Sequence, residues 1–292
     1  MDLTEIIKSK REHLSDSSIK TYCSILRSLY KKIFGTGDID IKKFDETDKI
    51  IDFLKELPAN KRKTILSALV VITDKKPYRD LMMDDIQTYK TEINKQETTP
   101  EQKENWIDTD ELNNVLDLHK KEADLLYKKS NLKPADLQEI QNYIILCLLS
   151  GKYIAPRRSM DYVNLKIKNV DKSKDNYIEK NKIIFNTYKT AKTYGQQIID
   201  IPKSLQPILK KWIAINPTDW LLFDTNNNKL TNVKMTQRLN KIFGKKSSVN
   251  QLRHTYLTDK YAPLMQAQKE MSKDMTEMGS SMIQAPTYVK LT

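Results

Sequence analysis

The sequence is short of cysteine, histidine and glycine, and it has no long hydrophobic run. Its 292 residues include two cysteines, three histidines and six glycines. Both cysteines, Cys23 and Cys147, lie in apolar helical patterns, so we expect buried thiols and no disulfide scaffold. The three histidines, His13, His119 and His254, show no spacing typical of a metal site. No metal or other cofactor is therefore expected.

Targeting and membrane signals are also missing from the sequence. No signal peptide opens the chain, and no apolar run reaches the roughly 20 residues that a membrane span needs. We therefore expect an intracellular protein, in the cytoplasm or nucleus of a host cell, with no membrane partner. The low glycine content, with 39% hydrophobic and 30% charged residues, is typical of a mainly helical protein with real cores.

Basic charge is what the sequence has in excess. The formal net charge is +12, and only +2 of it lies in the first 100 residues, which hold 19 basic and 17 acidic side chains. Residues 152–192 alone hold 11 basic and 4 acidic side chains, a local charge of +7. Such an asymmetry indicates a polyanionic partner, most simply nucleic acid, although a lysine-rich solvated surface gives the same count.

Helical patterns fill the first third of the chain. In residues 14–35, apolar side chains recur at helical spacing after a possible cap at Ser15 or Asp16, and Gly35 ends the run. Three more helical patterns follow up to residue 95. The polar, turn-prone stretch after them has no apolar periodicity. We therefore predict a helical domain at 1–95, a linker at 96–105 and a second domain at 106–292.

The second domain carries the β signal of the sequence. A helix capped by Asp108 or Thr109 and a strongly apolar helix ending at Gly151 are expected first. Two short β-branched runs, KIIFNTY and QQIIDIP, then flank the polar turn KTAKTYG. Four helical patterns follow, the last two at residues 248–262 and 265–278. The predicted fold class is mainly α with a small antiparallel β-hairpin or sheet (α+β).

Three basic clusters lie inside these patterned segments. In the first, Arg158 follows the apolar helix and Asp161 lies three residues later, on the same face of any helix there. The second is the turn with Lys189 and Lys192, which alone reads as a solvated turn.

In the third cluster, Arg253 and His254 lie among apolar residues that we expect to face the core, including Leu252, Tyr256 and Leu257. This predicts a partly buried basic pair, and a buried guanidinium requires an anionic partner such as phosphate.

These clusters indicate phosphate chemistry without a metal. There is no Walker-type glycine loop and no carboxylate cluster placed to hold two magnesium ions. Transfer of a phosphoryl group then needs arginines for the developing charge, a general acid for the leaving oxygen and a nucleophile. Tyr288, four residues from the end of the sequence, is the candidate nucleophile; a hydrophobic plug docking the last helix is the alternative.

The order of these motifs resembles the catalytic domain of the tyrosine recombinase (phage-type integrase) family. The motifs are RRSMDYVNLKIKNVD, TYKTAKTYGQQIIDIP, NQLRHTYLTDKY and EMGSSMIQAPTYVK. The family shows an arginine with an acidic residue three further on, a hairpin lysine, a His-x-x-Arg-His box, a Leu-Gly-His-like turn and a terminal tyrosine. The similarity covers about residues 105–292, and the helical front third looks like the family's core-binding domain.

The resemblance implies a role for each matching residue. Arg158 would be the first catalytic arginine, with Arg157 as the alternative, and Asp161 would orient it. Lys189 would be the general acid that protonates the departing 5′-oxygen, with Lys192 as the alternative.

The remaining matches lie near the end of the chain. Arg253 would be the second arginine, His254 would brace the site and Tyr288 would be the nucleophile. Asn250 stands where the family usually has the first histidine of its box, and Ser280 where its turn carries His or Trp. Asn and Ser can donate a hydrogen bond to a phosphate oxygen, but they cannot shuttle a proton near neutral pH.

The family's activity sets the expected function. The chain would be a site-specific DNA recombinase or integrase that cleaves and rejoins strands through a covalent 3′-phosphotyrosyl intermediate, without metal or ATP. Its partner would be double-stranded DNA, bound as a homotetramer and possibly as a monomer when free, and its composition suits a mobile element or virus. A type IB topoisomerase or a non-catalytic DNA-binding protein of the same fold are the alternatives.

Overall fold

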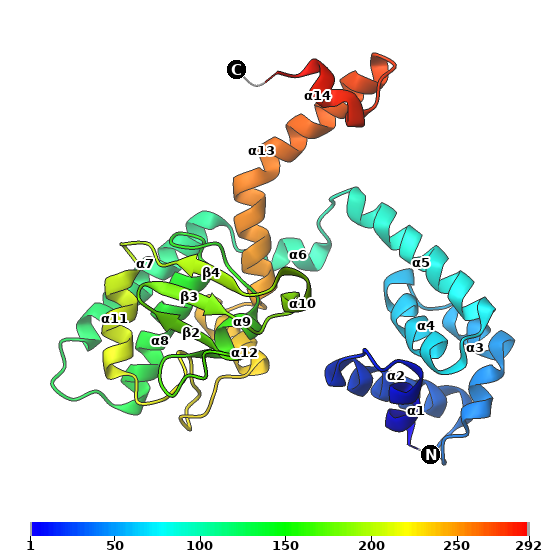
Figure 1. Ribbon diagram of the computed structural model, residues 1–292, viewed down its shortest axis with the longest axis horizontal. Helices are drawn as coiled ribbons and strands as arrows, with labels where there is room; N and C mark the ends of the chain where they lie inside the picture. Colours follow the sequence, from blue (N-terminus) through cyan, green and yellow to red (C-terminus); the bar gives the residue numbers. More distant parts are fainter. Residues whose placement is uncertain (1, 291–292) are drawn as a thin grey trace. The chain divides into compact units, whose positions relative to one another are not determined.

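The computed structural model describes residues 2–290 and divides into two compact units, with the boundary between Thr99 and Pro100 (Figure 1). Each unit has its own hydrophobic core. The predicted class is confirmed, because helices dominate and one small sheet accompanies them. Part of the stretch expected as a linker is helical, since α6 spans Pro100–Glu104. Within the described residues, no helix has the length and apolar character of a membrane span.

The first unit is built from helices alone in its described part. They are α1 (Leu3–Lys10), α2 (Asp16–Phe34), the 3₁₀ helix η1 (Ile41–Asp45), α3 (Thr47–Leu54), α4 (Ala59–Thr73) and α5 (Lys76–Asn94).

Local sequence signals and two polar links fix these helices. The Ser15 side chain caps α2 by accepting the backbone N–H of Ser18, and Gly35 ends the helix, as the sequence predicts. Between α4 and α5, Arg62 donates two hydrogen bonds to the buried Asp85 carboxylate, at 2.9 and 2.5 Å. A bidentate pair of this kind orients the two helices as well as neutralising the charge.

The second unit contains the remaining elements. Its helices are α6, α7 (Thr109–Leu126), α8 (Pro134–Leu149), α9 (Ser159–Val163), α10 (Ala191–Tyr194), α11 (Gln206–Ile215), α12 (Asn232–Phe243), α13 (Val249–Glu277), the 3₁₀ helix η2 (Met282–Gln284) and α14 (Ala285–Tyr288). Its strands are β1 (Leu165–Lys166), β2 (Asn176–Glu179), β3 (Lys182–Phe185) and β4 (Gln197–Asp200).

Helix α8 is the centre of the second core. Every residue from Tyr143 to Ser150 is buried, as the continuous apolar run of the sequence predicts. The amide of Gln141, also fully buried, exchanges two hydrogen bonds with the backbone of Phe223, which ties α8 to the chain that leads into α12. The ring of Phe223 stacks on Trp212 of α11 at 5.8 Å. Residues far apart in sequence therefore close around α8.

The sheet is larger and more varied than the predicted hairpin. Its order is β1-β2-β3-β4, with β2, β3 and β4 antiparallel but β1 parallel to β2. The sheet is therefore mixed, and the purely antiparallel expectation is wrong for β1, a strand of two residues that no periodicity can reveal. The connection from β3 to β4 is not a simple turn either, because it contains α10.

The last long helix differs from the sequence prediction. Two helices were expected, at 248–262 and 265–278, but α13 runs unbroken over 29 residues with Pro263 inside it. Proline fixes φ near −65°, a helical value, and removes one backbone hydrogen bond at a cost of about 3 kcal/mol, so a helix can continue through it. In Figure 1, α13 leaves the body of the second unit and carries η2 and α14 at its far end.

Candidate phosphate-binding site

The loop between α8 and α9 carries the first pair of arginines. Gly151 begins it with a φ of +77°, a conformation that L side chains rarely adopt. Arg157 and Arg158 follow a buried proline, and Arg158 has extended backbone at the N-cap position of α9. The backbone N–H of Arg157 donates to the hydroxyl of Tyr162, which itself donates to the carbonyl of Leu148 (3.1 and 3.0 Å). The loop is therefore fixed to the core at both ends.

Arg157, not Arg158, is the partner of Asp161. Nε of Arg157 lies 2.8 Å from Oδ2 of Asp161, and its Nη1 donates to Oε1 of Gln197 on β4 at 2.7 Å. Its guanidinium also lies over the ring of Phe185, 4.0 Å from the centroid. The expectation that Asp161 orients Arg158 is wrong here. Helix α9 begins only at Ser159, so the i,i+3 spacing does not place Arg158 beside the carboxylate.

Asp161 is the buried acid at the centre of the basic residues. It is 1% exposed, and its second oxygen, Oδ1, accepts no hydrogen bond from the residues that the structure describes. Burial raises its pKa, and the positive charges of Arg157, Arg158 and Arg253 oppose that rise. Arg157 contacts the carboxylate, and Arg158 and Arg253 lie near enough for their charges to act on it, so the positive charge left over suits a phosphate.

The start of α13 brings in the third arginine. The Ser248 side chain caps this helix through the N–H of Gln251. Arg253 is half-buried, and its Nη1 donates to Oδ1 of Asn250 at 3.1 Å, so the residue that replaces the family's histidine contacts the arginine directly. His254 is exposed, so the prediction of a partly buried basic pair holds for Arg253 alone.

A glycine and a tyrosine hold α13 against the loop before α9. A Cβ built on Gly151 would lie 2.3 Å from Cδ2 of Tyr256, so the aromatic ring packs directly on the glycine backbone. One residue earlier, the hydroxyl of Thr255 donates to the carbonyl of Ile107. These two contacts set the position of Arg253 relative to Arg157 and Arg158.

The two candidate lysines lie on the connection between β3 and β4. Lys189 and Lys192 are both exposed, and neither makes a hydrogen bond or ion pair within residues 2–290. Lys189 directly follows Tyr188, whose ring centroid is 5.1 Å from the guanidinium of Arg157. The base of this connection therefore touches the arginine site, while its lysines remain free to contact a ligand.

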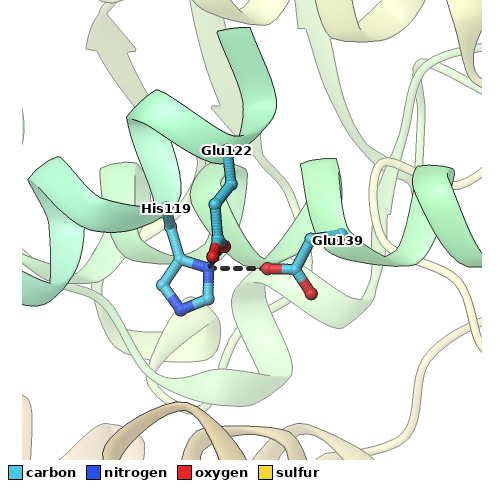
Figure 2. A group of neighbouring side chains, drawn as sticks. All are labelled: His119, Glu122 and Glu139. Carbon is cyan, nitrogen blue, oxygen red and sulfur yellow. Dashed lines mark hydrogen bonds and ion pairs between the residues drawn. The ribbon is translucent and has the colours of Figure 1, made fainter. Parts of the chain in front are cut away.

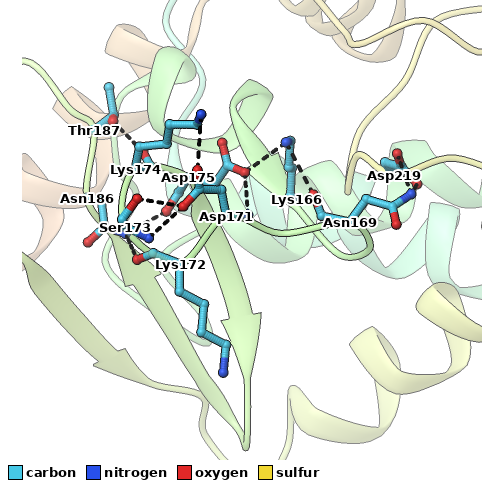
Figure 3. Close-up of polar contacts among 10 residues, drawn as sticks. All are labelled: Lys166, Asn169, Asp171, Lys172, Ser173, Lys174, Asp175, Asn186, Thr187 and Asp219. Atoms are coloured by element: carbon cyan, nitrogen blue, oxygen red, sulfur yellow. Dashed lines mark hydrogen bonds and ion pairs between the residues drawn. The ribbon is translucent and has the colours of Figure 1, made fainter.

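Much of the basic charge at 152–192 is already neutralised. In the polar network of Figure 3, Lys166 pairs with Asp175 and Lys174 with Asp171. Lys172, whose side chain points away from these acids, pairs with Glu179 instead. Arg158, Lys180, Lys189 and Lys192 have no acidic partner among the described residues. The charge available to a ligand is therefore concentrated around Arg158 and the β3–β4 connection.

Tyr288 lies apart from the arginines. It is the last residue of α14, 53% exposed, and its hydroxyl is 3.3 Å from Oγ of Ser280. Along α13, 24 residues separate Arg253 from Glu277, which is about 36 Å at the helical rise per residue. The structure thus places the predicted site residues in two separate sets. One set is the pair of Tyr288 and Ser280. The other set contains Arg157, Arg158, Asp161, Asn250 and Arg253. It does not bring the two sets together.

One group of side chains that the sequence did not single out could hold a metal ion. Within the described residues, only His119, Glu122 and Glu139 place three candidate ligand atoms together (Figure 2). Nδ1 of His119 is 2.7 Å from Oε1 of Glu139 and 3.4 Å from Oε2 of Glu122. Burial and the proximity of Glu139 raise the pKa of Glu122. In the sequence, the i,i+3 spacing of His119 and Glu122 was the signal that could have revealed this group.

A half-buried arginine, Arg238, lies beside this group. His119, Glu139 and Arg238 line the same cleft of about 780 Å³. The Arg238 guanidinium donates to the carbonyl of Gln138 and to Oδ1 of Asn142, at 3.1 and 3.2 Å, and Asn142 donates to Glu139. Positive charge from Arg238 therefore already stabilises the Glu139 carboxylate, and the group links α7, α8 and α12.

Comparisons with known proteins give structural neighbours only. No protein-family model and no curated protein matches the sequence. The chain is similar to the XerH site-specific recombinase bound to palindromic difH substrate in a post-cleavage complex, with a TM-score of 0.41, 14% identity, and 89% of this chain and 83% of that chain covered.

The pre-cleavage complex of XerH with difH gives a TM-score of 0.40 and 15% identity, over 89% of this chain and 85% of that chain. Both neighbours are recombinases, the class of protein that the sequence motifs resemble. Similarity at this level does not establish membership of a family, so the site residues themselves carry the functional conclusion.

Proposed function

We propose that this protein is a DNA strand transferase of the tyrosine recombinase or integrase type. The observation that carries the proposal is the buried pair of Arg157 and Asp161, with Arg158 and Arg253, from two distant segments, near enough for their charges to act on the same carboxyl group. Three guanidinium groups with one acid form a binding site for a phosphodiester. The connection from β3 to β4 touches Arg157 through Tyr188 and carries Lys189 and Lys192. One of these lysines supplies the proton that the leaving oxygen needs.

The proposed reaction is a transesterification without metal or ATP. The phenolic oxygen of Tyr288 attacks the scissile phosphorus, its proton is released, and a 3′-phosphotyrosyl bond forms. The bond from phosphorus to the 5′-oxygen breaks, and Lys189 or Lys192 protonates that oxygen. Attack by a 5′-hydroxyl on the tyrosyl ester reverses the step, and rejoining is recombination when the hydroxyl belongs to another duplex.

The arginines have separate parts in this proposal. Arg158 and Arg253 bind the non-bridging oxygens and stabilise the charge that develops on them. Arg157 is committed to Asp161 and Gln197, so it is a positioning residue that fixes the loop of Arg158. Asn250 holds Arg253 and donates its amide N–H to the phosphate, while Ser280 positions the hydroxyl of Tyr288.

Duplex DNA is the proposed partner. The unpaired cations Arg158, Lys189 and Lys192, on the loop before α9 and on the β3–β4 connection, are available for phosphate groups. We assign residues 1–95 to a second DNA-contacting domain, residues 96–105 to the linker and residues 106–292 to catalysis, with four copies assembled on DNA. The lysine- and asparagine-rich composition suits an AT-rich mobile element or virus as the source.

The test is capture of a covalent adduct. The probe is a pool of labelled duplexes, each with a nick and random flanking sequence, so that cleavage next to the nick releases a short strand and prevents rejoining. We expect a labelled protein band on a denaturing gel from the wild type and none from Tyr288→Phe. Tyr194→Phe, at a tyrosine that is 67% exposed, is the matched control and should keep the band. Adduct from Tyr288→Phe, or none from the wild type, would contradict the proposal.

A non-catalytic DNA-binding protein is the second candidate function. The observation that favours it is the separation of Tyr288 from the arginines. It predicts retention of the probe duplexes on a native gel with no adduct on the denaturing one. Relaxation of supercoiled DNA by dilute protein, without exchange between two marked duplexes, would instead identify a type IB topoisomerase.

A further inference from the structure

We infer that Tyr288 acts in the phosphate site of a second copy of this chain, not in its own. The inference rests on the proposed function and concerns how its site is completed. The arginine site and the nucleophile are both present in one chain, but they lie at opposite ends of α13. Two copies that exchange these helix ends complete both sites.

The first support is distance. Arg253 lies in the first two turns of α13, the helix ends at Glu277 about 36 Å further along, and Tyr288 belongs to the short α14 that follows this end. The segment after α13, residues 278–290, forms a tip that packs on the end of the helix. The N–H of Ser280 donates to the carbonyl of Met275, and Met275 and Ala285 are buried. Tyr288 is therefore fixed to the far end of the helix, beside Ser280.

The second support is the exposed course of α13. Every residue from Leu257 to Glu270 is exposed, and the buried residues of α13 lie towards its two ends. In Figure 1 the middle of α13 stands clear of the rest of the second unit. Helices in proteins gain most of their stability from packing of an apolar face, so a partner surface is expected to cover this exposed stretch.

The third support is an apolar stripe on that exposed helix. Leu257, Tyr261, Leu264 and Met265 follow the i, i+4, i+7, i+8 pattern of one helix face, and they are 49, 40, 66 and 42% exposed. Leu257 was expected to face the core, and it does not. Ile283 at the tip is 90% exposed. An apolar face does not bind the phosphates of DNA, whereas it suits the protein surface of a second copy.

A second copy of this chain is the partner that covers the apolar stripe, because the arginine site of each copy needs a nucleophile and the other copy can present its Tyr288. The arginine site lies at the other end of α13 from Tyr288 of its own chain, and the exposed tip presents this tyrosine. The alternative is a break of α13 at Pro263, which would return Tyr288 to its own chain. The helix is continuous there, and the side-chain pairs Gln266–Glu270 and Lys273–Glu277 support it further on.

The covalent step is the one already described, divided between two chains. The phenolic oxygen of Tyr288 of one copy forms the ester with the phosphorus held by Arg158 and Arg253 of the other copy. The bond from phosphorus to the 5′-oxygen breaks, that oxygen gains a proton, and the phenol loses one. The DNA strand is then attached to the chain that does not bind its phosphate.

Mixing two inactive variants tests the inference. Arg253→Ala, made longer by a fused tag, keeps Tyr288 but lacks a complete phosphate site, while Tyr288→Phe has the site and no nucleophile. The nicked random pool is again the probe. We expect little adduct from either alone, and from the mixture roughly a quarter of the wild-type yield, because half the pairs formed at random are mixed and each of these has one working site of two.

The size of the adduct shows which chain carries the DNA, and so whether Tyr288 reacted in the site of another copy or in its own. Delivery between copies puts the DNA on the tagged Arg253→Ala chain. No adduct from the mixture, beside a wild type that forms one, would overturn the inference and leave the proposed function standing. No adduct from the wild type would remove both. Arg158→Ala, tagged in the same way, repeats the test with a residue outside α13 in case Arg253→Ala fails to fold.

Discussion

The two ends of α13 differ in every property that the structure measures. The first end is docked: Leu252 and Thr255 are buried, and the ring of Tyr256 lies on Gly151. The far half is a solvent-exposed amphipathic helix with a small self-packed tip. One helix thus joins the docked Arg253 to an exposed tip with Tyr288, the proposed nucleophile. The difference teaches that the residues of one predicted site can all be present in a chain without lying together in it.

The largest expected effect comes from removing the docked arginine. Arg253→Ala should lower the rate of adduct formation by about 10²- to 10³-fold, because it removes a preorganised charge from the transition state. Single-turnover kinetics on the nicked pool measure this. Lys269→Ala, an exposed cation of the far half, is the control and should leave the rate unchanged. Equal losses of rate in the two variants would mean that a cation at the docked end of α13 contributes no more to the reaction than one in the far half.

The exposed stripe should matter next. Leu264→Asp is expected to lower the adduct yield at least about tenfold, since burying a leucine against a partner contributes about 1.5–3 kcal/mol. Gln266→Asp places the same charge on the opposite face of α13 and should have little effect. The melting temperature of the free protein should not fall in Leu264→Asp, because the position is exposed, and any small fall in Gln266→Asp reflects loss of its bond to Glu270. A normal yield from Leu264→Asp would exclude the stripe as a contact surface.

The docking contact itself can be tested by stability. Gly151→Ala adds a clash with Tyr256 to the strain of a positive φ, and we expect the free energy of unfolding to fall by about 2–4 kcal/mol. Gly244→Ala is the matched control. Its φ of +66° is similar but its surroundings are open, so strain of about 1 kcal/mol remains. Urea denaturation measures both, and similar losses would show that Tyr256 does not press on Gly151.

Salt dependence gives the smallest expected change. If Lys189 and Lys192 contact phosphates, replacing either with alanine should lower the slope of log K against log salt by about 0.9. Lys172→Ala is the control, because that lysine already pairs with Glu179 and should leave the slope almost unchanged. Fluorescence anisotropy with a fixed duplex at several salt concentrations provides the slopes. Identical slopes for the three variants would remove the β3–β4 connection from the DNA face.

Local signals in the sequence predicted much of the fold. The caps at Ser15 and Asp108, the helix end at Gly35 and the buried run of α8 were all found, since each depends on neighbouring residues. Pro263 misled the prediction of helix ends, because a proline disfavours a helix without forbidding it. The strand β1, two residues long, gave no periodic signal at all.

The sequence predicted which residues belong to the candidate site better than it predicted how they are arranged. The sequence indicated Arg158 and Arg253 as parts of one site. It paired Asp161 with the wrong arginine, because the start of α9 depends on the extended loop before it. Nor could it show that Tyr288 lies at the end of an unsupported helix. Sequence order carries no information about that distance, which depends on whether α13 breaks or continues.

Tyr288 as the nucleophile is the central claim, and identifying the amino acid joined to DNA tests it most directly. The adduct from the wild-type chain, digested with trypsin and nuclease, should give the peptide that follows Lys273 and ends at Lys290 with a nucleotide remnant on its one tyrosine, Tyr288. Mass spectrometry reads the modified position. A remnant on Tyr288 is the predicted result, and a remnant on any other residue would contradict it.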